Sequence, residues 1–301
     1  MKQIIKFCIF ALCVCNVLGD TCVVSDIPPD PRSKCCGRHL AAEHVRHGKG
    51  DASLNQFPWL ALIQDSSNRT TCTGVLISSR FILTAAQCGM QQREPTSVRL
   101  GEYNKTNTGP DCIMERGTKK CADRVMTVQI DFMVAHPNFS RQSIRGNDIA
   151  LIKLKDPVPY TEFVRPICLP TFDVNTSPSK DLRFIVAGWG SKPSHLQEDD
   201  VVKHYVEIPH KSLQSCKAAY EGHGVHRKFQ ITQNQICAGG EKDKDSCRGD
   251  GGGPLMYEKD GQHTSVGIVS YGPSVCGSVG IPSVYTNVYK YLPWINTVIY
   301  Y

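Results

Sequence analysis

The fold is decided in the stretch Phe57-Pro58-Trp59-Leu60-Ala61-Leu62-Ile63, where a polar, turn-rich leader gives way to a short apolar run. Similar runs recur along the rest of the 301 residues, each separated from the next by turn residues. They are Trp59–Ile63, Gly74–Ser78, Phe81–Leu83, Ile149–Leu154, Phe184–Ala187, Val201–Ile208 and Val266–Ser270. Many short strands at this spacing predict an all-β fold of closed or packed sheets.

The carboxyl end follows a different period. Apolar residues recur there at helical spacing, and Pro293 fits a first helical turn. The periodic residues are Val288, Tyr291, Leu292, Ile295, Val298 and Ile299. We therefore expect a terminal helix packed on the β-structure. A composition of 41% hydrophobic and 21% charged residues excludes disordered, collagen-like and coiled-coil classes.

Residues 1–19 have the pattern of a secretory signal peptide. Lys2 and Lys6 precede an apolar stretch from Phe7 to Leu18, and small residues lie before a cleavage position ahead of Asp20. The stretch is too short for a membrane anchor, and no later apolar run reaches the roughly 18 residues of a membrane span. The sequence thus predicts a secreted protein, in which residues 20–46 form a leader and linker.

The charge pattern gives no sign of a nucleic-acid partner. Removal of Lys2 and Lys6 with the signal peptide lowers the formal net charge from +6 to +4. The remaining charges of both signs are interspersed, so the sequence shows no basic stripe of the kind that binds nucleic acid.

Cysteine usage supports export. Three of the fifteen cysteines belong to the signal peptide, and the twelve that remain form an even set. In an exported chain an even set favours disulfides over metal ligation or redox catalysis, although the sequence alone does not choose the pairing. Four N-x-S/T sequons, which are candidate glycosylation sites, begin at Asn68, Asn104, Asn138 and Asn175.

Seven strings in fixed order carry a family resemblance. They are Phe57-Pro58-Trp59, Leu83-Thr84-Ala85-Ala86-Gln87-Cys88, Asn147-Asp148-Ile149-Ala150-Leu151, Ala187-Gly188-Trp189-Gly190, Cys247-Arg248-Gly249-Asp250-Gly251-Gly252-Gly253-Pro254, Ser270-Tyr271-Gly272 and Val284-Tyr285-Thr286. With them the chain resembles the trypsin/chymotrypsin family of serine endopeptidases over residues 47–301. The resemblance implies two antiparallel six-stranded β-barrels, an active site between them and a C-terminal helix.

Two finer features resemble the arthropod clip-domain proteases. These are a cysteine just before Gly37 and an inserted segment that runs from Asp111-Cys112 to Cys121-Ala122-Asp123. Together the two resemblances imply the disulfides Cys72–Cys88, Cys216–Cys237, Cys247–Cys276, Cys112–Cys121 and Cys36–Cys168, which leave Cys22–Cys35 as a remnant pair. A full clip domain needs six cysteines of its own, so we expect the clip to be lost or vestigial.

The catalytic positions of the resembled family are altered. Its triad consists of a serine, a histidine and an aspartate; here Asp148 is present, but Gln87 takes the histidine position and Gly251 the serine position. A glutamine amide does not act as a general base, and glycine offers no nucleophile. We expect Asp148 to be a structural carboxylate that accepts a hydrogen bond from Gln87. His263 and Ser265 are available as a substitute base and nucleophile, but nothing in the sequence places them in the cleft.

The activation segment also departs from the family pattern. The resemblance implies cleavage after Arg46 and burial of the new terminus against Asp250, beside the oxyanion-hole residue Gly249. Cleavage there would expose His47 in place of the usual apolar start Ile-Val-Gly-Gly. The tripeptide Arg248-Gly249-Asp250 lies in this turn, so we interpret its match to an integrin motif as accidental.

The substrate pocket keeps part of its pattern. The resemblance assigns Asp245 to the base of an Arg/Lys-specific pocket with Ser270 and Gly272 in its walls, while Ser283 replaces a wall glycine. We expect a filled pocket, with retained Arg/Lys binding as the alternative. Glu102 resembles a calcium ligand, so calcium is the one cofactor to consider and none is required.

The sequence therefore favours a secreted, catalytically inactive serine protease homologue that binds clip-domain proteases, zymogens or inhibitors. The resemblance implies a regulatory cofactor in an extracellular immune cascade of the prophenoloxidase type. Three alternatives stay open: a decoy or venom-type antagonist, a microbe or cell adhesion protein, and an endopeptidase with unconventional chemistry.

Overall fold

The computed structural model describes residues 22–39, 49–90, 94–115, 117–140, 146–176, 181–192, 200–222 and 231–301. The predicted signal peptide and the cleavage position Arg46 lie outside these residues. None of the described helices is long and apolar enough to cross a membrane.

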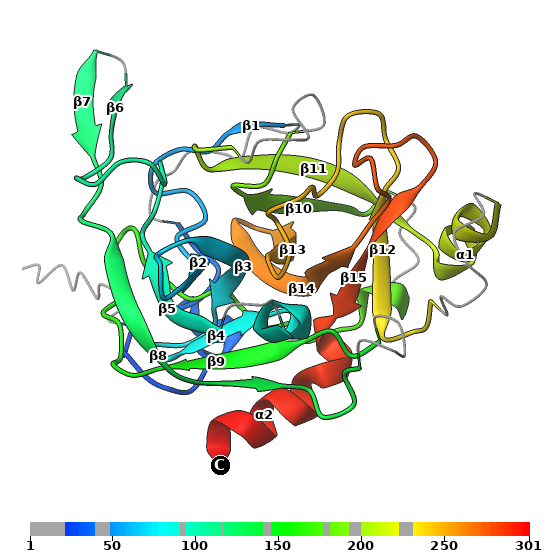
Figure 1. Ribbon diagram of the computed structural model, residues 1–301, viewed down its shortest axis with the longest axis horizontal. Helices are drawn as coiled ribbons and strands as arrows, with labels where there is room; N and C mark the ends of the chain where they lie inside the picture. Colours follow the sequence, from blue (N-terminus) through cyan, green and yellow to red (C-terminus); the bar gives the residue numbers. More distant parts are fainter. Residues whose placement is uncertain are drawn as a thin grey trace, which may run out of the picture.

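The first half of the chain forms a closed antiparallel barrel, at the left of Figure 1. Its strands, in barrel order, are β2 (Leu60–Asp65), β3 (Thr70–Leu76), β4 (Phe81–Thr84), β9 (Ala150–Leu154), β8 (Met126–Ala135) and β5 (Pro95–Leu100). All residues of β2 and β4 are buried, and so are the last five of β3 and all but one of β9, as expected for apolar runs that fill a barrel.

The second half forms a second six-stranded antiparallel barrel, which the pairing of β11 with β12 closes. Its strands are β10 (Arg183–Gly188), β11 (His204–Lys211), β12 (Gln235–Gly239), β13 (Pro254–Lys259), β14 (Gln262–Tyr271) and β15 (Pro282–Asn287). A short strand, β1 (Lys49–Asp51), pairs with β11 at the outer edge. The predicted all-β fold of two barrels is confirmed, and each apolar run of the sequence coincides with a strand.

The predicted terminal helix is confirmed as α2 (Leu292–Tyr300), which follows the short turn η4 (Val288–Tyr291). Its buried residue Ile295 belongs to the largest core cluster, which also contains Leu83 of the first barrel and Ile268 of the second, and Figure 1 shows α2 below β9. The remaining short helical turns are η1 (Pro31–Ser33), η2 (Ala86–Met90) and η3 (Val174–Thr176).

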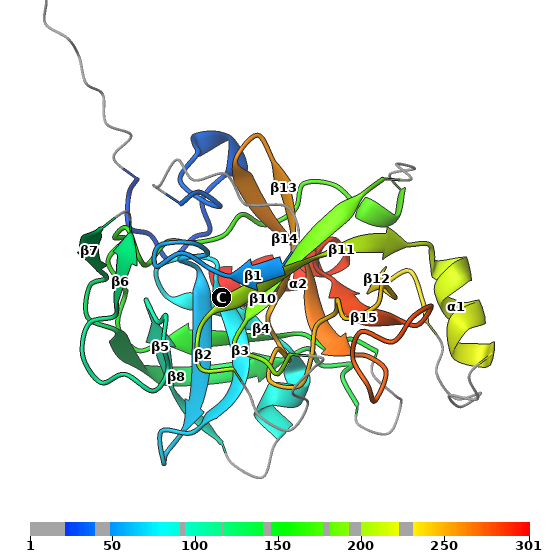
Figure 2. The same cartoon turned by 90° about the horizontal axis from the view of Figure 1, so that it is seen from above.

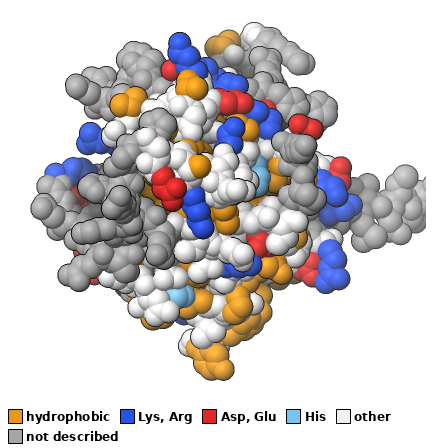
Figure 3. All heavy atoms as spheres, turned by 90° about the vertical axis from the view of Figure 1, so that its right-hand side faces the viewer, with side chains coloured by type: hydrophobic (Ala, Val, Ile, Leu, Met, Phe, Trp, Pro, Cys, Tyr) orange, Lys and Arg blue, Asp and Glu red, His pale blue; other side chains and the backbone are white. Residues whose placement is uncertain are grey.

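One helix escaped the sequence analysis. The helix α1 (Leu213–Gly222) lies outside the second barrel, at the right of Figure 1. It buries only Cys216 and Tyr220, so its apolar period is weak. The sequence does offer one sign of a helix start at Ser212, whose hydroxyl accepts the Ser215 N–H at 3.1 Å as an N-cap. Around it, Figure 3 shows basic and acidic side chains interspersed on this face.

A two-stranded hairpin stands apart from both barrels. It consists of β6 (Cys112–Glu115) and β7 (Thr118–Cys121), and Figure 1 shows it projecting at the upper left. The Cys112–Cys121 disulfide clamps its base. The buried Asp111 carboxylate holds it to the body by accepting the N–H groups of Tyr103 and Asn104.

All twelve cysteines that follow the predicted signal peptide are paired as the resemblance implies. The Cys36–Cys168 bond ties the leader to the body across 132 residues of sequence. The leader is more than a linker, because residues 22–39 pack on the barrels beside the β13–β14 turn (Figure 2). There the Gly37 N–H donates to Pro166 O and Gly37 O accepts from the His263 N–H.

The candidate glycosylation sites differ in their surroundings. Asn68 and Asn138 are exposed, whereas the Asn104 Oδ1 accepts the Thr106 hydroxyl at 2.7 Å. The Asn175 side-chain nitrogen, the atom that would carry a glycan, donates to Gln235 O at 2.8 Å. Asn68 and Asn138 are thus the better placed acceptors.

We predict that the double variant Cys36→Ser/Cys168→Ser loses up to about 5 kcal/mol of unfolding free energy, because this bond closes the longest loop. The matched control, Cys112→Ser/Cys121→Ser, opens only the projecting hairpin and should lose no more than about 3 kcal/mol. Urea denaturation of the two secreted variants measures both values. A larger loss in the hairpin variant would contradict the role assigned to the leader bond.

Candidate functional site

A hydrogen-bonded group built around Asp148 lies where the two barrels meet. Gln87 lies on η2, Asp148 just before β9, and Ser270 on β14 of the second barrel. The Gln87 backbone N–H donates to Asp148 Oδ1 at 2.9 Å, and its side-chain Nε2 donates to Asp148 Oδ2 at 2.9 Å. The same Nε2 donates to Ser270 O at 2.6 Å, so this amide joins the two barrels.

Asp148 is almost fully buried, and the second barrel holds it at two points. The Ser270 hydroxyl donates to Asp148 Oδ2 at 2.6 Å, and the Thr286 hydroxyl donates to Asp148 O at 2.7 Å. Burial raises the pKa of the Asp148 carboxyl, while the hydrogen bonds from Ser270 and Gln87 oppose that rise. The expected hydrogen bond from Gln87 to Asp148 is present, and the carboxylate serves a structural role in this arrangement.

Gly251 lies beside this group on the turn that precedes β13. Its carbonyl accepts the Thr73 N–H at 2.9 Å, and the Cys88 Sγ lies 3.9 Å from the same oxygen. A Cβ at Gly251 would meet open space, so the position has room for a side chain and presents none. A neutral amide and a glycine together supply no general base and no nucleophile.

The two substitutes that the sequence offered are remote from this group. His263 and Ser265 are fully buried in the first part of β14. The His263 ring packs against Trp59 beneath the leader, with 5.2 Å between ring centroids, and the Ser265 hydroxyl donates to Gly267 O. The structure therefore brings neither of them to Asp148.

The turn from Cys247 to Gly251 corresponds to the expected oxyanion hole. Gly249 has a φ of 96°, which favours glycine, and the Asp250 N–H donates to Cys247 O. The Asp250 side chain is only 3% exposed and accepts the N–H groups of Gly190 and Cys247 at 3.0 and 2.9 Å. Arg248 and Gly249 are exposed, but the buried Asp250 does not present its carboxylate on the surface as an adhesion tripeptide would.

The side chain of Ser283, a wall residue, occupies space in the predicted substrate pocket. A Cβ on Gly272 would collide with the Ser283 hydroxyl, which shows that the two walls are in contact. Asp245 is 6% exposed, and its oxygens accept the N–H groups of Ser246 at 2.9 Å and Gly277 at 3.1 Å. The close approach of Ser283 to Gly272 is the contact expected of a narrowed pocket.

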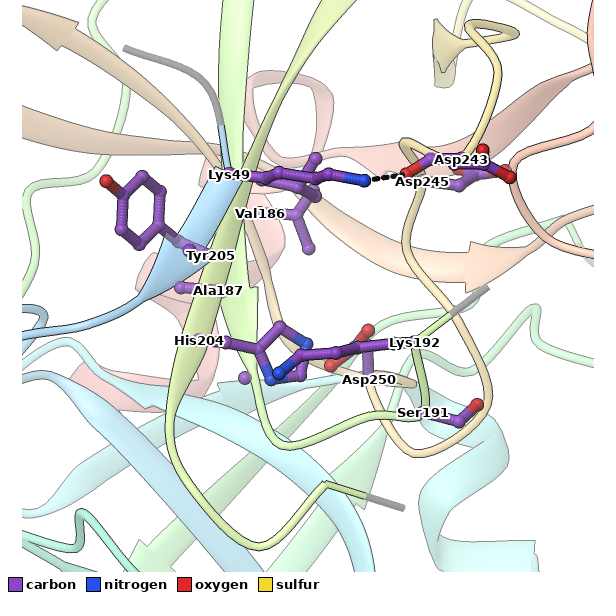
Figure 4. A pocket seen from close by; sticks show the side chains of 13 residues that line it. Lys49, Val186, Ala187, Ser191, Lys192, His204, Tyr205, Asp243, Asp245 and Asp250 are labelled. Atoms are coloured by element: carbon purple, nitrogen blue, oxygen red, sulfur yellow. Dashed lines mark hydrogen bonds between the residues drawn. The ribbon is translucent and has the colours of Figure 1, made fainter. Parts of the chain in front are cut away.

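Asp245 instead faces a cavity of about 370 Å³ behind the slot (Figure 4). Asp250 lines the same cavity, together with Lys49 of β1, Lys192 and His204 of β11. No sequence motif connects these three basic residues, because segments distant in the chain bring them together. The sequence gives one sign of them, because Lys49 replaces the second glycine of the family's Ile-Val-Gly-Gly start.

The predicted calcium ligand is paired within the chain. The Glu102 carboxylate forms an ion pair with Arg99, and the described residues contain no cluster of three or more His, Cys, Asp or Glu that could hold a metal ion. Nearby, the buried Lys203 amine donates to Leu54 O at 3.2 Å, and burial lowers its pKa to about 7. The structure thus gives the calcium prediction no support.

The buried Asp245 makes stability depend on pH. Burial, followed by the Asp250 charge, raises the pKa of Asp245 to about 6, against the partial opposition of Ser283 and two backbone N–H groups. The folded state therefore binds a proton that the unfolded state releases above about pH 4. For this group the free energy of unfolding falls as pH rises from about 4 to 6, by up to about 3 kcal/mol.

We predict that Asp245→Asn removes this component, so the wild type loses more stability than the variant between pH 4 and pH 7. Urea titrations at both pH values measure the difference. The control Asp260→Asn changes a side chain on an exposed turn and should keep the wild-type dependence. Equal pH dependence in wild type and Asp245→Asn would contradict the assignment.

Comparison with known proteins agrees with this geometry. The protein-family model "Trypsin" matches residues 47–295. The chain is 41% identical over 287 residues to the phenoloxidase-activating enzyme of Bombyx mori, covering 90% of this chain and 64% of that relative. It is 40% identical over 288 residues to phenoloxidase-activating factor 3 of Holotrichia diomphalia, covering 92% and 78% respectively.

A solved structure is similar over most of the chain. The Drosophila Grass clip serine protease of the Toll pathway superposes with a TM-score of 0.73 at 33% identity, covering 88% of this chain and 74% of that one. A family match over most of the sequence, relatives near 40% identity and the double barrel agree with one another. The chain belongs to the trypsin family of serine proteases, and its relatives there include clip-domain proteases.

Proposed function

We propose that this protein is a secreted, catalytically inactive member of the family that regulates an extracellular protease cascade by non-covalent binding. The observation that carries the proposal is Gly251, where a catalytic serine would stand and where the structure leaves open space instead of a hydroxyl. Gln87 adds to it, because a neutral amide cannot accept the proton that nucleophilic attack would release.

The rest of the molecule supports a binding role that depends on the protease-like shape of the two barrels. Six disulfides hold both barrels, the leader and the hairpin, and such a number is typical of extracellular proteins. Gln87 preserves the contact between the barrels that a catalytic histidine would otherwise occupy. A protein with this scaffold offers a protease-shaped surface to a protease, zymogen or inhibitor without cleaving it.

The names of the relatives suggest which kind of protease cascade is involved. Two of them are described as activating phenoloxidase, and a solved relative belongs to the Toll pathway. The chain spans 64% of the length of the Bombyx relative, so the activity of that whole protein is not transferred here. We propose a cofactor role in a prophenoloxidase-type cascade, in which cleavage after Arg46 would serve release or binding.

Active-site labelling tests the loss of catalysis. We predict no incorporation of a fluorophosphonate serine reagent by the wild type or by Gly251→Ser, because the single variant still lacks a base. The double variant Gln87→His/Gly251→Ser restores a nucleophile and a base, and any labelling should be confined to it. Stoichiometric labelling of the wild type would contradict the proposal.

Reconstitution tests the cascade role. Purified protein added to a clip-protease and prophenoloxidase mixture should raise phenoloxidase activity in a dose-dependent way, and reduced, unfolded protein at the same concentration should not. A dose-dependent fall would identify an antagonist instead. No change in either direction, before or after cleavage at Arg46, would contradict a regulatory role of either sign.

A further inference from the structure

The Cys112–Cys121 disulfide differs from the other five disulfides in its exposure. Both of its cysteines are exposed, at the base of the β6–β7 hairpin. The Cys22–Cys35 bond is half-buried, and each of the remaining four bonds joins two buried cysteines. A thiolate in solution exchanges only with a disulfide that it can reach, and exposed disulfides are the labile ones. Of the six bonds, Cys112–Cys121 is therefore the one best placed to be opened in the folded protein.

The arrangement of the hairpin leaves one face of the disulfide uncovered. β6 and β7 pair only with each other, and Cys112 and Cys121 are direct partners in their register. Since side chains alternate between the two faces of a strand, Met114 and Lys119 share a face with the disulfide. Met114 is 69% exposed and Lys119 is exposed as well, so none of the described elements packs over this face. The hairpin projects from the body in the same way in Figure 1.

Lys119 favours a reaction of this bond with thiolates. The exchange needs one thiolate to arrive and a cysteine thiolate to leave, and a nearby ammonium group stabilises both. Lys119 lies two residues before Cys121 on the same face, and the segment from Cys112 to Cys121 holds three basic residues against one acidic residue. The adjacent Asp111 carboxylate is buried and accepts hydrogen bonds from the loop that precedes it.

The root of the hairpin, formed by Asp111 and Ala122, does not depend on the disulfide. The buried Ala122 N–H donates to Asp111 O at 2.8 Å, one residue outside each cysteine. The Asp111 carboxylate is fixed to the body by the Tyr103 and Asn104 N–H groups at 3.2 and 2.9 Å. Because the root brackets the cysteines, opening of the disulfide frees β6 and β7 and leaves the barrels in place. The root also keeps the two thiols close together, so the bond can re-form on oxidation.

We propose that Cys112–Cys121 is a thiol–disulfide exchange site, which a dithiol protein of the thioredoxin class opens reversibly to release the hairpin. The other five disulfides stay closed in this reaction because they are covered. Opening of the bond does not depend on the proposed cascade role, since only the hairpin and its root take part.

The exchange consists of two nucleophilic substitutions at sulfur. A thiolate of the reductant attacks one sulfur of the pair, forms a mixed disulfide and displaces the other cysteine as a thiolate, which takes up a proton from water. The second thiolate of the reductant then attacks the reductant's own sulfur in the mixed disulfide, releases the second cysteine and closes the disulfide of the reductant. Two electrons thus pass from the dithiol to the cysteine pair.

Reduction of the secreted protein by thioredoxin, thioredoxin reductase and NADPH at pH 7.5 tests the proposal. We expect the wild type to oxidise one equivalent of NADPH and Cys112→Ser/Cys121→Ser to oxidise none, since one disulfide takes two electrons. Alkylation and peptide mass spectrometry should locate the new thiols at Cys112 and Cys121, with labelling roughly tenfold faster than at the cysteines of the other bonds. No oxidation of NADPH by the wild type, equal oxidation by the double variant, or labelling spread over several bonds would overturn the proposal.

The variant Lys119→Gln tests the position of the ammonium beside the bond. It should be reduced severalfold more slowly than the wild type, and the difference should shrink at high salt because exposed charges are screened. The matched control Lys242→Gln removes an exposed ammonium between β12 and β13 and should react as the wild type does. Both variants keep all six disulfides, so the comparison holds even if the double cysteine variant fails to fold. Equal rates in the two lysine variants would contradict the role assigned to Lys119.

Limited digestion with trypsin measures the release of the hairpin. The reduced and alkylated protein should be cut after Lys119 or Lys120 severalfold faster than the oxidised protein, and an unchanged rate would overturn the proposed release. A parallel incubation with glutathione at equal thiol concentration distinguishes the class of reductant. Glutathione should react more slowly, because a monothiol lacks the second attack within the same molecule. Faster reduction by glutathione than by thioredoxin would contradict the assignment to a dithiol protein.

Discussion

The buried Asp148 carboxylate, at the boundary between the barrels, is the group on which the arrangement of the two halves depends. It accepts hydrogen bonds from the Gln87 backbone and side chain on one side and from the Ser270 hydroxyl on the other. A buried carboxylate without such donors would lower the free energy of unfolding, so these hydrogen bonds stabilise the folded state. Gln87 keeps the geometry and does not titrate, which makes the junction independent of pH at that side chain.

The disulfides and the catalytic positions depend on different physical properties, so one set can be kept while the other changes. The crosslinks limit the unfolded chain and preserve the outer shape, and none of them requires an active centre. The family's catalysis depends on an imidazole and a hydroxyl, whereas positions 87 and 251 of this chain hold an amide and a glycine within two intact barrels. Gly251 lies in open space, and its loss of a side chain therefore costs little packing. Shape and chemistry are separable in this fold.

The same separation explains Asp245. Ser283 closes the slot in front of this carboxylate, while the cavity behind it stays open and also contains Asp250. The rise of the Asp245 pKa follows from its burial beside a second negative charge. Asp245, which the resemblance assigns to substrate recognition, thus lines the cavity, and its pKa is set by its burial there and not by its sequence motif.

The residue pattern by itself determined many short strands and a terminal helix, because both follow from local periodicity. The two barrels and the disulfide pairing were implied by the resemblance, which rests on the order of the motifs, and the sequence also shows Gln87 and Gly251 in place of a histidine and a serine. Only the tertiary structure decided that the leader packs on the barrels and that Lys49, Lys192 and Asp245 line one cavity. The helix α1 belongs with these, because it buries only two side chains and leaves almost no periodic signal. The physical reason is that a local pattern sets which residues form a strand, whereas a cavity arises between strands that are distant in the chain.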